Sequence, residues 1–328
     1  MTNSPMSRRK FAQLAAMAGA GTLLLPGTAT AENGRTAQYY YDHAYRLAGD
    51  DPVLLDIIAA LTPGFTVPRP TAPAPMKIFD NLAVLGVGWV SAVAVLTSDG
   101  IILIDALTST ADAETVIVPG LRSLGADPAT VKYVVVTHGH GDHFGGAQYF
   151  ADNYGARVLA APADWDHMED AGQPGRPVRD LDISDGQRLT LGDTTLTLHH
   201  TPGHTPGTVS PVIPLRANGR RHTGMLWGGT KPPADIATLE TYLSSVEKFR
   251  FRLRQARVDV ELSNHPFCDH GLERMQQMLD SPRATNPFIL GTDGTQRFMN
   301  VMDAMVHGLI LDAGTTPATT SLIGHRCC

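Results

Sequence analysis

The most constraining feature of this chain is a glycine-rich loop with three histidines and an aspartate, Thr137-His138-Gly139-His140-Gly141-Asp142-His143-Phe144-Gly145-Gly146. It follows an apolar run, 133–136, that predicts a buried strand, and it precedes residues 147–150, which predict the start of a helix. Glycines allow tight turns, so side chains that are close in sequence can converge on one point. Histidine and aspartate are ligand types for zinc and similar metals, so the loop predicts a metal site.

The segments around the loop predict alternating strands and helices. Strands are expected over 82–87, 90–97, 101–105, 133–136, 157–161, 189–191, 194–198, 208–215 and 258–262, and helices over 52–61, 112–124, 147–154, 237–255, 271–279 and 296–311. Asp99-Gly100 and Asn218-Gly219 predict hairpin turns, and Pro119 should kink or shorten its helix. The strand–helix–strand order leading into the histidine loop predicts a layered α/β fold.

Two further polar residues stand just after predicted strands. Asp105 ends an apolar strand, where an acidic side chain caps a turn or needs a buried partner. His204 lies between two proline–glycine turns, in Thr201-Pro202-Gly203-His204-Thr205-Pro206-Gly207, so its backbone has little entropy to lose on binding. The constrained backbone makes His204 a candidate binding residue.

Of the remaining histidines, His265 is the preferred candidate because it directly follows a short predicted strand. Asp269 and His270 lie nearby and are its alternatives. His199 and His200 face opposite sides of a strand, so at most one of them can reach a site, and a core or surface place is expected for both. His167 is expected at the surface.

The pattern His138-x-His140-x-Asp142-His143 resembles the metal signature of the metallo-β-lactamase superfamily. Thr-Pro-Gly-His-Thr around His204 and the histidine at 265 resemble its later ligand motifs. The resemblance covers most of the chain that follows the N-terminal signal. It implies an αββα sandwich, in which two mixed β-sheets pack together and helices cover the outer faces.

The resemblance also implies a role for each site residue. His138, His140 and His204 would hold a first zinc ion, and Asp142, His143 and His265 a second, with Asp105 supporting the loop from behind. Three histidines leave one position open on a tetrahedral zinc ion, as in catalytic sites. Water bound to such an ion has a pKa lowered to about 7, so a metal-bound hydroxide can attack a carbonyl. Asp142 would orient that hydroxide and help move a proton to the leaving group.

The ligand set suggests a subclass. Many hydrolases of the superfamily place a metal-bridging aspartate near 227–230, and first-subclass metallo-β-lactamases place a cysteine there, but this chain has Trp-Gly-Gly-Thr. Histidines plus Asp142 are most similar to the third subclass of class B β-lactamases. We therefore expect a dinuclear zinc hydrolase acting on a β-lactam or related cyclic amide. The segments 209–211 and 263–267 depart from that subclass.

Other functions stay open at this point. A lactone, ester or sulfate-ester hydrolase of the same fold is the alternative. An iron-dependent redox member of the superfamily is more distant, because the flavin-partnered diiron proteins have a glutamate where His140 stands. A metal-binding protein without catalytic activity is the last alternative.

The first residues predict an export signal. Ser7-Arg8-Arg9-Lys10-Phe11 is a twin-arginine sequence, an apolar segment spans 14–25, and Ala29-Thr30-Ala31 offers a cleavage site. We expect a signal peptide over 1–31 with cleavage after Ala31, and a periplasmic or secreted location. The apolar segment is too short to span a bilayer, and no lipid-anchoring cysteine follows it.

The expected domains after the signal are a helical and proline-rich extension, 32–75, and a catalytic domain, 76–328. The proline-rich connector 62–75 could be a linker or a lid over the site. A net charge of −6 gives no basic footprint for nucleic acid, so the expected partner is a small-molecule substrate. Three cysteines, Cys268, Cys327 and Cys328, do not form a disulfide framework, and the oligomeric state stays open.

Overall fold

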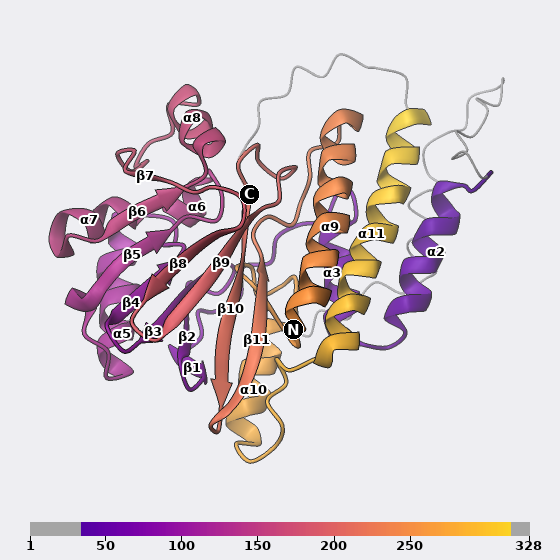
Figure 1. The fold of residues 1–328 in the computed structure, drawn as a ribbon. Helices are drawn as coiled ribbons and strands as arrows, with labels where there is room; N and C mark the ends of the chain where they lie inside the picture. The colour runs from indigo at the N-terminus through magenta and orange to yellow at the C-terminus, as the bar shows by residue number, and fades with distance from the viewer. Residues whose placement is uncertain (1–33, 316–328) are drawn as a thin grey trace.

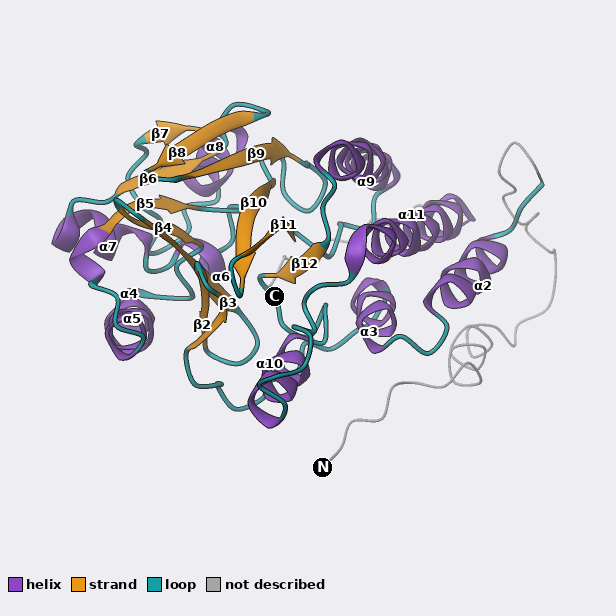
Figure 2. Ribbon diagram, turned by 60° about the horizontal axis from the view of Figure 1, so that its bottom comes forward, coloured by secondary structure: helices purple, strands orange, loops and turns teal. Residues whose placement is uncertain are grey.

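Two β-sheets pack face to face in the computed structural model, and helices cover the outer face of each sheet (Figures 1 and 2). The structure describes residues 34–315. The predicted export signal and the two C-terminal cysteines lie outside this range. Since both sheets are mixed, the expected αββα sandwich of the metallo-β-lactamase fold is confirmed.

The first sheet has seven strands in sequence order. They are β1 (Met76–Phe79), β2 (Leu82–Gly86), β3 (Ser91–Thr97), β4 (Gly100–Ile104), β5 (Val131–Val135), β6 (Arg157–Ala160) and β7 (Leu181–Asp182). Strands β1 to β4 pair antiparallel, and β4 to β7 pair parallel. Because parallel strands end at the same edge, the histidine loop after β5 emerges beside the end of β4.

The second sheet has five strands in the order β12-β11-β10-β9-β8. They are β8 (Gln187–Leu191), β9 (Thr194–His200), β10 (Val209–Ala217), β11 (Arg220–Trp227) and β12 (Val260–Ser263). Only the β11–β12 pair is parallel. The predicted turn at Asn218-Gly219 joins β10 to β11, and both residues have the positive φ that this two-residue hairpin needs.

Three apolar layers hold the sandwich together. Side chains from both sheets, among them Ile102, Leu196 and Ile213, are buried between the sheets. Helices α2 (Ala37–Ala48), α3 (Pro52–Leu61), α9 (Ile236–Ala256) and α11 (Gly291–Thr315) cover the second sheet, as Figure 2 shows. Helices α5 (Val118–Ser123), α7 (Ala147–Tyr154) and α8 (Pro162–Asp170) cover the first sheet, and α10 (Gly271–Asp280) lies near β1.

The helix expected over 112–124 is broken, as the proline predicted. It consists of α4 (Thr110–Asp112), a π-helical turn (Ala113–Ile117) and α5. Pro119 lies in the first turn of α5, where its missing N–H group costs least. The π-helical turn ends two residues before Pro119. No helix within residues 34–315 combines the length and hydrophobicity needed to cross a bilayer.

Candidate metal centre

The site lies where strand ends of both sheets meet. His138 and His140 lie in the loop after β5, and a short helix, α6 (Gly141–Phe144), carries Asp142 and His143. The loop between β9 and β10 carries His204, and His265 follows β12. The structure therefore brings together all six residues expected as ligands, in two groups of three that could each hold a metal ion.

The first triad consists of His138, His140 and His204. The Nε2 atom of His204 lies 3.1 Å from Nε2 of His138 and 3.1 Å from Nδ1 of His140. The Nδ1 atom of His138 lies 2.6 Å from the carbonyl oxygen of Gly228, and Nδ1 of His204 bonds the carbonyl oxygen of Lys231. A carbonyl only accepts, so both Nδ1 atoms carry the hydrogen. The two Nε2 lone pairs therefore face each other, an arrangement that fits a shared cation.

The second triad consists of Asp142, His143 and His265. The Nε2 atoms of His143 and His265 lie 3.2 Å apart, and Oδ2 of Asp142 lies 3.3 Å from the first and 3.7 Å from the second. His265 donates its Nδ1 hydrogen to the carbonyl of Trp89 at 2.9 Å. Both carboxylate oxygens of Asp142 are buried without a hydrogen-bond partner among the described residues. A buried carboxylate in this position is costly unless a cation accompanies it, so the donor set fits a metal ion.

Burial sets the protonation of most of these histidines. It lowers the pKa of His204 to about 3 and the pKa of His140 and His265 to about 4, and neighbouring imidazoles add to the effect. Burial likewise places the pKa of His138 well below its ordinary value. These four side chains are therefore neutral at pH 7, which is the form that coordinates a metal.

His143 behaves differently because two carboxylates face it. Burial lowers its pKa, but the charges of Asp142 and Asp105 outweigh this and raise the pKa to about 10. Burial opposes ionisation of Asp142, yet the nearby histidines, His143 above all, hold its pKa well below the usual range. A metal ion at Nε2 of His143 would compete with a proton there.

Asp105 supports the second triad from behind the loop. Its Oδ1 accepts the backbone N–H of Thr137 at 2.8 Å, and its Oδ2 accepts the Thr137 hydroxyl at 2.8 Å and lies 2.7 Å from Nδ1 of His143. Asp105 is fully buried and has a φ of +60°, which is uncommon for a residue other than glycine. The hydrogen bond from His143 leaves Nε2 of that ring directed at Asp142 and His265.

Asn264 joins the two triads and was not predicted from the sequence. Its Nδ2 lies 3.2 Å from Oδ2 of Asp105 and 3.2 Å from the carbonyl oxygen of Gly228. The same carbonyl accepts the Nδ1 hydrogen of His138, whose ring centroid lies 3.9 Å from that of His143. One backbone carbonyl at the end of β11 thus contributes to the orientation of both groups.

Asp164 on α8 is a second residue that the sequence did not single out. Its Oδ2 accepts the backbone N–H of Gly139 at 2.8 Å and the hydroxyl of Thr205 at 2.7 Å, and its Oδ1 accepts the N–H of Gly207 at 2.8 Å. Burial raises its pKa, and these hydrogen bonds oppose the rise. Asp164 therefore ties the histidine loop to the loop that carries His204.

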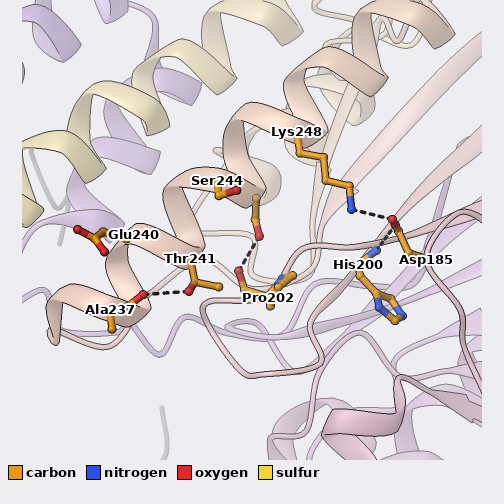
Figure 3. Close-up of a pocket in the computed structure, with 9 residues that line it drawn as sticks. Asp185, His200, Pro202, Ala237, Glu240, Thr241, Ser244 and Lys248 are labelled. Atoms are coloured by element: carbon orange, nitrogen blue, oxygen red, sulfur yellow. Dashed lines mark hydrogen bonds and ion pairs between the residues drawn. The ribbon is translucent and has the colours of Figure 1, made fainter.

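Helix α9 supports the His204 loop from the opposite side (Figure 3). Ser245 donates a hydrogen bond to the carbonyl of Pro202 at 2.7 Å, beside an open groove of about 560 Å³. Across the groove, Lys248 forms an ion pair with Asp185 at 2.6 Å. Ser245 helps to hold the loop in place, and the groove contains none of the six candidate ligands.

The competing histidines lie outside both triads. His199 packs against Phe249, with ring centroids 5.8 Å apart, and His200 bonds the carbonyl of Ile183 at 2.8 Å. His270 bonds Asp56 at 2.9 Å. His167, expected at the surface, is partly exposed, and its ring centroid lies 6.2 Å from that of His140.

The two glycine positions after β11 leave no room for a side chain. A Cβ atom on Gly229 would lie 2.6 Å from Cβ of His204, and one on Gly228 would lie 2.0 Å from the carbonyl oxygen of Val209. The backbone of this segment, rather than a side chain, serves the site through the Gly228 and Lys231 carbonyls.

This fold and site are those of the metallo-beta-lactamase superfamily, whose family model matches residues 85–216. Among solved structures it is similar to BJP-1, a subclass B3 metallo-beta-lactamase of Bradyrhizobium japonicum, with a TM-score of 0.61 and 25% identity over 73% of this chain and 93% of that one. The solved relatives support the expected similarity to the third subclass.

Two curated relatives broaden the comparison. A hydroxyacylglutathione hydrolase of Anaeromyxobacter dehalogenans is 30% identical over 204 residues, which is 60% of this chain and 66% of the relative. The N-acyl homoserine lactonase AttM of Azorhizobium caulinodans is 30% identical over 165 residues, 44% of this chain and 62% of the relative. The chain thus spans just under two thirds of these relatives. Its two histidine groups fit metal binding.

Proposed function

We propose that the chain is a dinuclear zinc hydrolase that opens a β-lactam or a related cyclic amide. One observation carries this proposal. The two triads consist of five histidines and one aspartate, and glycine stands, without space for a side chain, where many relatives place a bridging carboxylate. The resemblance to BJP-1 over nearly its whole length supports the same conclusion.

His138, His140 and His204 would hold one zinc ion, and Asp142, His143 and His265 the other. The chemistry that zinc supplies at such a site is activation of water as a nucleophile and polarisation of the substrate carbonyl. The protein's task is to present neutral imidazoles in fixed orientations. The carbonyls of Gly228, Lys231 and Trp89 do this for three of them by accepting the Nδ1 hydrogen.

Asp142 is the residue we assign to proton handling. Its Oδ2 faces His143 and His265, which leaves Oδ1, buried and without a hydrogen bond in the described structure, to orient the attacking water. A proton accepted at Oδ1 passes to the amide nitrogen as the ring opens, because the leaving nitrogen becomes basic when its bond to carbon breaks.

The test is turnover of a chromogenic cephalosporin by the zinc-loaded protein. We expect chelator-sensitive hydrolysis that is lost in His140→Ala and kept in the matched control His199→Ala, which changes a histidine outside both triads. Zinc analysis should give two ions per chain for the wild type and the control. Two bound zinc ions without any cephalosporin turnover would refute the β-lactam assignment.

A second candidate function is hydrolysis of a lactone or another ester. The similarity to the lactonase AttM favours it. Faster turnover of N-acyl homoserine lactones than of cephalosporins, with the same loss in His140→Ala, would select this alternative. Bound iron with oxygen uptake in place of hydrolysis would select redox chemistry instead.

We also propose export to the periplasm or beyond, on the twin-arginine sequence at Arg8 and Arg9. Cell fractionation of the full chain beside a variant with Lys at both positions tests this. Equal distribution of the two proteins would contradict it.

A further inference from the structure

A proline-rich segment lies beside the second triad. We call this segment, residues 62–75, the strap. The ring of Phe65 lies 5.6 Å from that of Phe267, which in turn lies 5.1 Å from the ring of His265. Further along the strap, the guanidinium carbon of Arg69 lies 3.6 Å from the ring centroid of Trp89. The strap therefore contacts Trp89 and Phe267, two aromatic neighbours of the candidate ligand His265.

Trp89 connects Arg69 to the candidate metal centre. Its ring is stacked on that of His265, with centroids 5.9 Å apart and planes at 20°, and its carbonyl accepts the Nδ1 hydrogen of His265. The same residue thus orients a candidate ligand through its backbone and supports a cation through its side chain. A positive charge therefore lies one aromatic residue away from a candidate ligand of the second triad.

The backbone holds Arg69 in place before any substrate binds. Pro68 and Pro70 flank it, so the allowed backbone conformations of this short stretch are few. The strap also touches the turn that carries Trp89: a Cβ atom on Gly88, whose φ is +97°, would lie 2.4 Å from the carbonyl oxygen of Pro70. Only glycine permits this contact, and the fixed strap reduces the entropy that Arg69 loses on binding.

Arg69 is an exposed residue, and its guanidinium forms no ion pair with a carboxylate among residues 34–315. Other arginines of this acidic chain, such as Arg157 and Arg297, form ion pairs with aspartates. A guanidinium that lies over an aromatic ring still has N–H groups at its edge. Those donors match the two oxygens of a carboxylate.

We propose that Arg69 determines substrate specificity by binding a carboxylate of the substrate, so that the substrates of this hydrolase are anionic. The aromatic rings of Trp89 and Phe267 would contact the apolar part of the same molecule. The identity of the ring that is opened rests on the function proposed above, whereas the recognition of a carboxylate rests on the strap alone.

The test compares Arg69→Gln with the wild type on a chromogenic cephalosporin and on its carboxylate methyl ester. Loss of a charge-assisted pair at an exposed position should raise KM for the free acid about tenfold, with kcat nearly unchanged. KM for the ester should stay the same. The matched control is Arg35→Gln, since Arg35 also lies over an aromatic ring, that of Tyr39, at 4.8 Å.

A binding measurement keeps this test independent of the reaction. The zinc-loaded wild type and Arg69→Gln are titrated calorimetrically with phenylacetate and with neutral phenylacetamide. Arg69→Gln should bind phenylacetate more weakly than the wild type does, and should bind phenylacetamide equally well. This result without cephalosporin turnover would refute the proposed reaction and support the role of Arg69. Unchanged KM and Kd for the anions, or equal losses for charged and neutral molecules, would overturn the role of Arg69.

Discussion

Replacing Asp105 with asparagine tests how the second triad is kept in its coordinating form. In the wild type, Oδ2 of Asp105 accepts the Nδ1 hydrogen of His143 and Oδ1 accepts the backbone N–H of Thr137. Asparagine has nearly the same shape but replaces one acceptor with an NH₂ group. Whichever way the amide is turned, its NH₂ faces another donor, either at His143 or at Thr137.

The structure sets the expected size of the effect. A buried donor left unpaired costs about 1–3 kcal/mol, so the free energy of unfolding should fall by this amount. If the NH₂ group faces His143, the imidazole hydrogen moves to Nε2, and the lone pair no longer points at Asp142 and His265. Loss of such an orienting partner weakens metal binding about 10–100-fold, and we expect this loss in the second triad.

Calorimetric zinc titration of the metal-free protein measures the zinc affinity of each triad. ¹⁵N NMR of His143 reports which of its ring nitrogens carries the hydrogen. Zinc affinity at the first triad should stay unchanged, because in the described structure no hydrogen bond joins Asp105 to its three histidines. Asp99→Asn, at an exposed turn, is the control. An Asp105→Asn protein that binds two zinc ions with wild-type affinity would refute the reasoning.

Three further changes give distinct expected outcomes. Gly229→Ala should remove about one zinc ion per chain in metal analysis, because its Cβ would displace His204, and two retained ions would contradict this. Asp164→Asn should lower the free energy of unfolding in urea by about 1–3 kcal/mol, since it places an NH₂ group among three donors. Burial raises the pKa of Glu261, so the stability of the wild type should fall as the pH rises above 4.5. The stability of Glu261→Gln should fall less over the same range, and identical pH profiles of Tm would contradict this.

Hydrophobic periodicity predicted most of the elements closely. Helix α9 was expected over 237–255 and spans Ile236–Ala256, because its apolar stripe is continuous and Asp235 caps its first turn. Strand β12 was expected over 258–262 and spans Val260–Ser263. Its bounds are set by parallel pairing with β11, and the local sequence contains no signal of that pairing.

Elements that depend on distant partners were missed. Helix α2 was not predicted. Its sequence is rich in tyrosine, and its buried face packs against α11, a contact that the local sequence does not show. Tyr41 illustrates this: a Cβ atom on Gly308 would lie 2.3 Å from Cε1 of that ring. Helix α11 also begins at Gly291, five residues before the expected position.

The candidate ligands were easier to find than the residues that hold them. The spacing of His138, His140, Asp142 and His143 is local, so it is visible in the sequence, and the structure places all six expected ligands in two triads. Their binding of metal stays a prediction. Asn264 and Asp164 act across long sequence separations, and a single asparagine or aspartate gives no pattern from which such contacts can be inferred.

The packing of α2 against α11 has a consequence for the order of folding. Tyr41 near the start of the described chain donates a hydrogen bond to Asp312 near its end, and the ring of Tyr40 stacks on His307. During synthesis, the apolar faces of α2 and α3 therefore cannot pack against α11 until α11 itself has left the ribosome. The outer helical layer of the second sheet is completed last, and a nascent chain that stops before α11 carries exposed apolar surface prone to aggregation.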